Sequence, residues 1–90
     1  MFYVYVLQSR KDGQFYTGYA SNLKDRIKEH NLGISKSTSY RQPLTLVYYE
    51  ACLNRKDAMR RENYLKTTWG KRYIKNRIRN YMLENKDSGT

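Results

Sequence analysis

The chain has 90 residues, of which eighteen are Lys or Arg and eight are Asp or Glu, so its formal net charge is +10. A chain of this length forms one domain and buries only somewhat over ~60% of the surface that it exposes when unfolded. Its single cysteine excludes an internal disulfide, no apolar run approaches the ~20 residues of a membrane span, and the first residues lack the features of a signal peptide. We therefore expect an intracellular, cytoplasmic protein. Its charge and ten tyrosines favour nucleic acid, rather than a membrane, as its partner.

Two short aromatic strands are predicted at the start of the chain. Residues 3–7 alternate with a period of two, and residues 15–20 have the same aromatic, β-prone composition. The turn signal Lys11-Asp12-Gly13 lies between them. If the two strands pair, Tyr5 and Tyr16 reach a common ligand, because cross-strand neighbours are only about 5 Å apart.

A helix is predicted over residues 23–31. The pair Ser21-Asn22 offers an N-cap, and Gly33 ends the helix. Arg26 and His30 are four residues apart and lie at the border of the apolar stripe of this helix. We expect both side chains to face a site on the sheet.

A basic loop is predicted over residues 34–42, followed by a third strand at residues 44–50. Hydroxyl and cationic side chains in such a loop commonly hydrogen-bond phosphates of a DNA backbone. A merely solvated connection is an equal alternative, because polar loops are the default linkers. The side chains concerned are Ser35, Lys36, Ser37, Thr38, Ser39 and Arg41.

A second helix is predicted from residue 55 to about residue 67, with Asn54 as its N-cap. Its apolar side collects Ala58, Met59, Leu65 and, if the helix extends that far, Trp69. Glu62 lies in the middle of this apolar side, where an ionised carboxylate is costly unless it is paired or binds a cation. A structural ion pair and a metal site are both open at this position.

A third helix is predicted over residues 71–83, after an interruption at Gly70. Its apolar stripe consists of Ile74, Ile78, Tyr81 and Met82, and its other face carries Arg72, Asn76 and Arg79. Like charges on one helix face repel, and contact with nucleic acid would relieve that repulsion. We predict one domain over residues 1–84, followed by a polar tail at residues 85–90.

The candidate residues fit the requirements of phosphodiester hydrolysis. This reaction needs a water that loses its proton, a cation at the phosphate and positive charge for the transition state. Glu62, as a single carboxylate, suits Mg²⁺, and Arg26 suits the phosphate. Tyr5 or Tyr16 would need a pKa below the usual ~10 to act as the base, and His30 is the alternative.

The same residues carry a resemblance to the GIY-YIG nuclease family. Tyr3-Val4-Tyr5 resembles the first motif, and Tyr16-Thr17-Gly18 resembles the second. Two further stretches are similar to the family's helices that carry its Arg, His and Glu: residues 23–31 and residues 60–66. The resemblance covers residues 2–80, and the chain is similar to a small stand-alone member of the family.

The resemblance implies an α+β fold with a small three-stranded antiparallel sheet flanked by helices. It also implies an endonuclease that cleaves DNA with Mg²⁺ or Mn²⁺. By this likeness Tyr5 is the favoured general base or water-orienting group and Tyr16 is its partner. Arg26 is the phosphate clamp, His30 a proton relay or orienting group, and Glu62 the sole protein ligand of the metal.

A lone catalytic module is expected to recognise the structure or backbone of DNA rather than its sequence. Branched, nicked or single-stranded DNA are the substrates considered, with repair or recombination as the setting. The expected nucleic-acid interface consists of Lys36, Tyr40, Arg41, Lys66, Lys71 and Arg72. The alternative function is a non-catalytic nucleic-acid-binding module that uses its tyrosines for stacking. A protein-interaction adaptor is the third alternative, but it does not explain the net positive charge of the chain.

Overall fold

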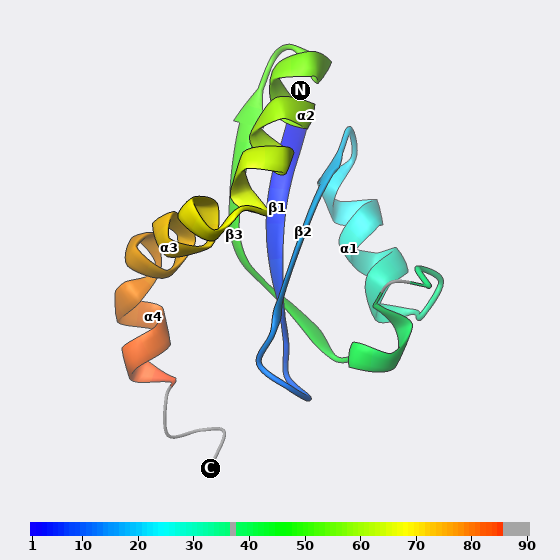
Figure 1. The fold of residues 1–90 in the computed structure, drawn as a ribbon. Helices are drawn as coiled ribbons and strands as arrows, with labels where there is room; N and C mark the ends of the chain where they lie inside the picture. The colour runs from blue at the N-terminus through cyan, green and yellow to red at the C-terminus, as the bar shows by residue number, and fades with distance from the viewer. Residues whose placement is uncertain (37, 86–90) are drawn as a thin grey trace.

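The computed structural model describes residues 1–36 and 38–85 and has an α+β fold (Figure 1). Three strands form one antiparallel sheet in the order β2-β1-β3. Strand β1 spans Phe2–Ser9, β2 spans Phe15–Ala20 and β3 spans Leu44–Cys52. The predicted fold class and all three predicted strands are confirmed.

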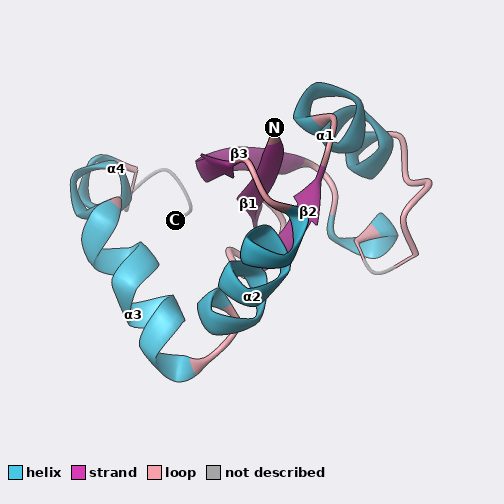
Figure 2. Ribbon diagram, turned by 90° about the horizontal axis from the view of Figure 1, so that it is seen from above, coloured by secondary structure: helices cyan, strands magenta, loops and turns pink. Residues whose placement is uncertain are grey.

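Four α-helices and one short 3₁₀ helix surround the sheet. They are α1 (Leu23–Asn31), η1 (Ser39–Arg41), α2 (Arg55–Leu65), α3 (Thr68–Arg77) and α4 (Arg79–Glu84). Helix α1 covers one face of the sheet, and α2 and α3 lie on the other side (Figure 2). The side chains of Asn22 and Asn54 cap α1 and α2, as predicted, by accepting hydrogen bonds from backbone N–H groups of the first turn.

The alternation of side chains along β1 builds two separate hydrophobic clusters. Val4 and Val6 point to one face, where the buried residues of α2 and α3 cover them. Tyr5 and Leu7 point to the other face, towards α1 and Leu44. The central strand is therefore buried on both sides, as its nearly continuous apolar sequence requires.

The predicted helix break at Gly70 is wrong, because Gly70 lies within the first turn of α3. The hydroxyl of Thr67 accepts a hydrogen bond from the Gly70 N–H and so starts a new helix. A Cβ on Gly70 would collide with the carbonyl of Tyr64 and the backbone of Leu65, at the end of α2. Glycine therefore serves close helix packing here. The break between α2 and α3 lies at Lys66 and Thr67, and a second break at Ile78 separates α3 from α4.

The predicted apolar side of α2 is only partly correct. Ala58 and Leu65 are buried, but Met59 is exposed and Trp69 is 68% exposed. Trp69 belongs to α3, because α2 ends at Leu65, and the Arg72 guanidinium lies 5.3 Å from the centre of its ring.

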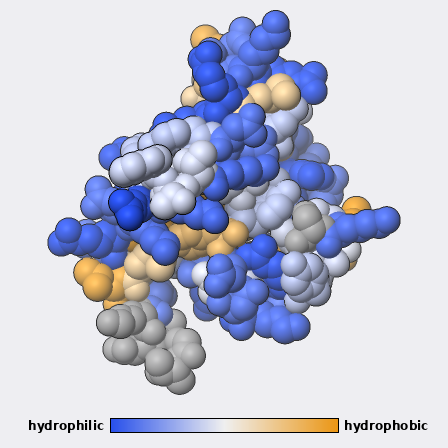
Figure 3. Space-filling model, in the orientation of Figure 1, coloured by the Kyte–Doolittle hydropathy of each residue, from blue (hydrophilic) through white to orange (hydrophobic). Residues whose placement is uncertain are grey.

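The end of the chain falls largely outside the structural description. Of the predicted polar tail, only Asn85 belongs to the described residues, where it follows α4. Within the described part of the chain, no helix combines the length and the apolar character needed to cross a membrane. Hydrophilic residues cover most of the face seen in Figure 3.

Candidate active site

Tyr5 lies at the centre of the candidate site, on the middle strand, and is only 1% exposed. Its partner across the β1–β2 ladder is Gly18. A Cβ on Gly18 would lie 2.5 Å from the Tyr5 hydroxyl oxygen. The glycine of the Tyr16-Thr17-Gly18 sequence therefore leaves the space that the phenol ring of Tyr5 occupies.

A chain of hydrogen bonds runs from helix α1 through Tyr5 to the loop that follows α1. Arg26 Nε donates to the Tyr5 hydroxyl at 3.4 Å. The same hydroxyl lies 2.9 Å from His30 Nε2, and His30 Nδ1 lies 2.6 Å from Thr38 Oγ1. Tyr5, His30 and Thr38 are all fully buried in the free protein, so these bonds lie in a low-dielectric environment, where they are stronger than in water.

The direction of these hydrogen bonds follows from the charge state of His30. Burial lowers the pKa of His30, and the nearby charge of Arg26 lowers this pKa further, so the imidazole is neutral at neutral pH. An arginine only donates, so the Tyr5 oxygen accepts from Arg26 and its own proton points to His30 Nε2. The neutral ring then carries its proton on Nδ1 and donates it to Thr38.

Burial raises the pKa of Tyr5 above its ordinary value, and the hydrogen bond from Arg26 opposes this shift without cancelling it. Tyr5 therefore keeps its proton at neutral pH in the free protein. The hydrogen bond to His30 provides this proton with an acceptor within reach.

Tyr16 completes the aromatic part of the site from strand β2. Its ring centre lies 6.5 Å from that of Tyr5 and 5.1 Å from that of His30. The two tyrosines thus lie together on neighbouring strands, as the predicted pairing required. Tyr16 is only partly buried, so it is the tyrosine of the pair that contacts solvent.

Glu62 approaches the site from α2, on the other side of the sheet. Its side chain is 16% exposed, and its Oε2 lies 3.0 Å from Lys66 Nζ. Its negative charge contributes to the raised pKa of Tyr5, so the carboxylate acts on the same group as Arg26 does. The ion pair left open by the sequence is therefore present, and Lys66 is the only ion-pair partner of Glu62 among the described residues.

A metal at this site would find a single protein carboxylate. Within residues 1–36 and 38–85, no three side chains of His, Cys, Asp or Glu gather into a metal-binding group. Mg²⁺ is bound in many phosphate sites by one or two carboxylates, keeping several of its waters. Glu62 is partly buried, and its carboxylate has the oxygen chemistry that such an ion prefers.

The basic loop contains two side chains whose positions differ from the expected ones. Thr38 belongs to a loop expected either to contact phosphates or to be a solvated connection, but it is buried and hydrogen-bonds His30. Arg41 was expected at the nucleic-acid interface, but its side chain is 13% exposed and donates to the Phe15 carbonyl at 3.3 Å. Its Nε also lies 3.7 Å from an Asp12 carboxylate oxygen. Arg41 therefore ties the loop to the β1–β2 hairpin, a placement that argues against contact with a phosphate.

The other expected interface residues are exposed. These are Lys36, Tyr40, Lys66, Lys71 and Arg72. Sequence reasoning missed the contact of Thr38 with His30, because it depends on how the loop folds back over eight residues. No local pattern indicates that contact.

Comparisons with known proteins show which family the chain belongs to. The family described as the GIY-YIG catalytic domain matches residues 1–78. A UPF0213 protein of Clostridium perfringens is 48% identical over 67 residues, which cover 73% of this chain and 71% of the relative. A UPF0213 protein of Staphylococcus haemolyticus is 46% identical over 66 residues, covering 72% of this chain and 79% of the relative.

A solved structure shares the fold. The solution NMR structure of a UPF0213 protein from Bacillus halodurans is 38% identical in sequence, covers 82% of each chain and gives a TM-score of 0.52. The matched region contains every residue of the site described above. The chain therefore belongs to the GIY-YIG family, whose members are generally endonucleases.

Proposed function

We propose that the protein is a divalent-metal-dependent endonuclease that hydrolyses phosphodiester bonds in DNA. The observation that supports this proposal most strongly is a partly buried carboxylate, that of Glu62, whose charge acts on Tyr5, the residue to which Arg26 and His30 are hydrogen-bonded. The hydrogen-bonded chain of Arg26, Tyr5 and His30 comes from the α1 face, and the carboxylate of Glu62 comes from the α2 face. A binding site for DNA has no need of a partly buried carboxylate at this position, because the charge repels phosphate.

Arg26 is the proposed phosphate ligand. Its Nε is bound to Tyr5 and its Nη1 lies 3.2 Å from Glu29, which leaves further donors of the guanidinium for a substrate. It lines an open groove of about 700 Å³, to which Tyr19 and Arg55 also contribute. A guanidinium held by two partners in this way is ready to bind a phosphate without reorganising.

Tyr5 and His30 are the proposed path for the proton of the attacking water. The Tyr5 oxygen takes the proton from the water as the phenol proton moves to His30 Nε2, so the proton ends on the imidazole. The lowered pKa of His30 keeps the ring neutral and able to accept a proton at neutral pH. Tyr16, which contacts solvent, is the proposed group that orients the water.

Glu62 is the proposed ligand of Mg²⁺ or Mn²⁺. When bound, such an ion supplies positive charge that stabilises the phosphate and the leaving oxygen. Lys66 would then leave the carboxylate and be available to a second phosphate of the substrate. Branched, nicked and single-stranded DNA are the proposed substrates. An enzyme that recognises the structure of DNA rather than its sequence would serve repair or recombination.

The test is a panel of labelled linear, nicked, branched and single-stranded DNAs, with RNA for comparison, incubated with Mg²⁺ or Mn²⁺. We expect metal-dependent nicking that is lost in Glu62→Gln and Arg26→Ala. Glu84→Gln removes the same charge from an exposed position of α4 and should cut like the unmodified protein. Full nicking by both site variants would reject the proposal.

Binding without cutting is the second candidate function. It is favoured by Trp69, an exposed aromatic ring with the Arg72 guanidinium nearby, which is suited to stacking on bases. A binding-only protein should gain DNA affinity in Glu62→Gln, since the repelling carboxylate is gone, and should give no product with either metal.

A further inference from the structure

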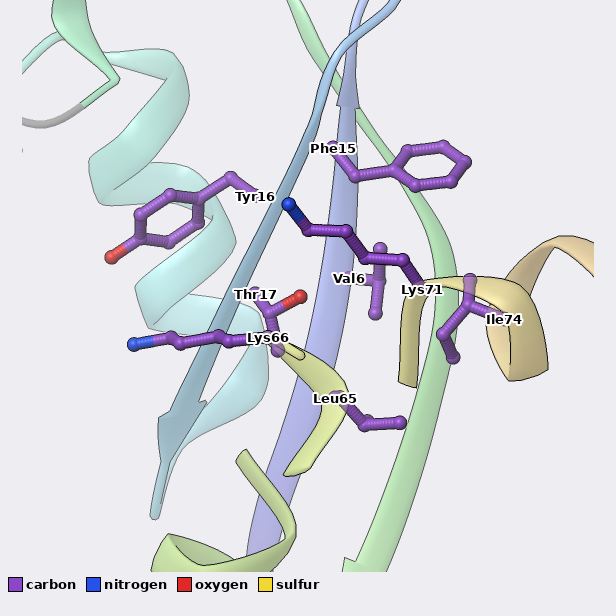
Figure 4. A pocket seen from close by; sticks show the side chains of 8 residues that line it. All are labelled: Val6, Phe15, Tyr16, Thr17, Leu65, Lys66, Lys71 and Ile74. Carbon is purple, nitrogen blue, oxygen red and sulfur yellow. The ribbon is translucent and has the colours of Figure 1, made fainter. Parts of the chain in front are cut away.

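A pocket of about 210 Å³ lies next to the candidate site, between the first half of β2 and the junction of α2 with α3 (Figure 4). Its apolar surface comes from Val6, Leu65 and Ile74, which belong to the core, and from the ring of Phe15. The pocket is thus an opening into the hydrophobic cluster on the α2 face of the sheet.

The rim of this pocket is cationic. Lys66 and Lys71 line it, and in Figure 4 the Lys66 side chain extends across β2 towards the side where Tyr16 lies, while the Lys71 side chain reaches β2 from α3. Thr17 projects between them from the strand. An apolar floor and two ammonium groups therefore meet in one small space.

The pocket adjoins the candidate active site through two of its own residues. Tyr16 lines the pocket and packs against His30, and Lys66 lines it and contacts Glu62 at 3.0 Å. A group held in the pocket would therefore contact two residues that also contact the candidate active site.

The chemistry of the pocket selects its occupant. A free phosphate would use the lysines and leave the apolar floor exposed, and an apolar side chain of a protein would leave the lysines unpaired. A nucleotide uses both, because its base has an apolar face and its phosphate is anionic. The volume is below the ~300–1,000 Å³ of pockets for drug-sized ligands, which suits one ring system.

We infer that this pocket binds one unpaired base of the DNA strand next to the phosphate that is cut, with the phosphate of that nucleotide on Lys66 and Lys71. This inference rests on the proposed nuclease function and adds the form of the substrate. A base that enters the pocket must leave its complementary strand, so single strands, flaps and frayed ends are bound in preference to continuous duplex.

The first test moves a single abasic position along a labelled single-stranded oligonucleotide that is cut at one known bond. We expect cleavage and affinity to fall about tenfold at one position beside that bond and little elsewhere, since one stacked base contributes affinity on this scale. Affinity is measured by fluorescence anisotropy without metal, so that it does not depend on cutting. Equal sensitivity at every position would overturn the inference.

The second test fills the pocket. Thr17→Phe places a ring between the two lysines, and Thr45→Phe makes the same change on β3, the other edge of the sheet. We expect Thr17→Phe to bind single strands about tenfold more weakly and to lose the position-specific effect of the abasic site. Thr45→Phe should behave as the unmodified protein. Circular dichroism melting of both variants checks that each is folded. If either variant is unfolded, the abasic series on the unmodified protein decides the question alone.

The two proposals fail in different ways. If the protein cuts DNA but neither the abasic series nor Thr17→Phe has a local effect, the pocket inference is wrong and the nuclease function stands. If no substrate is cut with either metal, the nuclease function is wrong, and the metal-free anisotropy series still decides whether the pocket takes a base.

Discussion

At the scale of single residues, the candidate site is organised around the hydroxyl of Tyr5. Arg26 and His30 both hydrogen-bond this hydroxyl, and Gly18 leaves room for it. Arg26 and His30 come from α1, and Gly18 comes from β2. Because all three residues contact one oxygen atom, we expect a small change at any of these residues to affect the geometry of the site more than the fold.

Gly18→Ala tests the room left for Tyr5. The new methyl group would lie 2.5 Å from the Tyr5 hydroxyl oxygen and 2.7 Å from Cζ, so the ring must move. We expect a loss of about 1–3 kcal/mol in the free energy of unfolding, typical of overpacking, together with a loss of nicking. Urea denaturation and the nicking rate measure the two effects.

Gly13→Ala is the matched control for this change. Gly13 has φ +75°, so alanine there is strained by about 1 kcal/mol, but no atom of the described residues lies within 4 Å of the added Cβ. It should lower stability and leave the nicking rate of the folded protein unchanged. Equal loss of nicking in both variants would contradict this account of Gly18.

The pH dependence of stability tests the neutral state of His30. The pKa of His30 is lower in the folded protein than the ordinary 6.5. Between these two pKa values, the unfolded chain therefore binds a proton that the folded chain does not bind. Stability should therefore fall as the pH decreases below about 6.5, and level off below the folded pKa. His30→Gln should show a flatter profile between pH about 7 and about 5 in urea denaturation. An unchanged slope in this variant would mean that His30 is not buried as a neutral ring.

The two tyrosines, Arg26 and His30 could be chosen from the sequence because strand and helix periods place them locally. The contact of His30 with Thr38 could not, since it depends on the path of a loop with no regular pattern. The inward turn of Arg41 is of the same kind, because nothing in a run of Ser, Thr, Lys and Arg distinguishes a buried cation from an exposed one.

At the scale of elements, α2 is the helix whose rotation decides where Glu62 points. Arg61, the residue before Glu62 on α2, donates hydrogen bonds to both carboxylate oxygens of Glu50 on β3, at 2.8 and 2.9 Å. The Arg61 guanidinium also lies 4.8 Å from the ring centre of Tyr73, on α3. One arginine thus ties α2 to a strand and to the next helix.

The ion pair of Arg61 with Glu50 is partly buried and is expected to matter for stability. Burial alone would raise the pKa of Glu50, but the hydrogen bonds from Arg61 and Tyr48 outweigh it and lower this pKa. Arg61→Met should lower the free energy of unfolding by about 1–2 kcal/mol at neutral pH, since the pair is partly solvated. It should also reduce nicking by letting α2 rotate.

Arg60→Met is the control, because Arg60 is exposed and its pair with Asp57 lies within α2. It should change stability by no more than about 0.5 kcal/mol. Similar losses in both variants, measured by urea denaturation, would show that the contact with Glu50 does not hold the helix.

The starts of α1 and α2 were predictable because Asn caps act locally, whereas the junction of α2 with α3 was not. The rule that glycine interrupts helices fails at Gly70, where the missing side chain allows two helices to pack. The hydroxyl of Thr67 is the local signal for the new helix, whereas the sequence-based interpretation placed residue 67 at the end of the preceding helix.

At the scale of the whole molecule, the net charge of +10 predicts how DNA binding depends on salt. Each phosphate contact adds about 0.7 to the slope of log affinity against log salt for single strands. Lys71→Gln should reduce this slope by about that amount, and Lys28→Gln, on the exposed side of α1, should leave it unchanged. Anisotropy titrations at several salt concentrations measure both, and equal slopes for the two variants would exclude Lys71 from the interface.

The two clusters on opposite faces of the sheet have a consequence for partly open forms of the protein. Arg26 and His30 depend on the cluster under α1, and Glu62 depends on the cluster under α2 and α3. Local opening of either face would disperse half of the proposed catalytic groups while the basic surface of the other half persists. A transiently opened molecule should therefore still adhere to DNA but be unable to cut it, so the cleaving form is restricted to molecules in which both halves are closed at once.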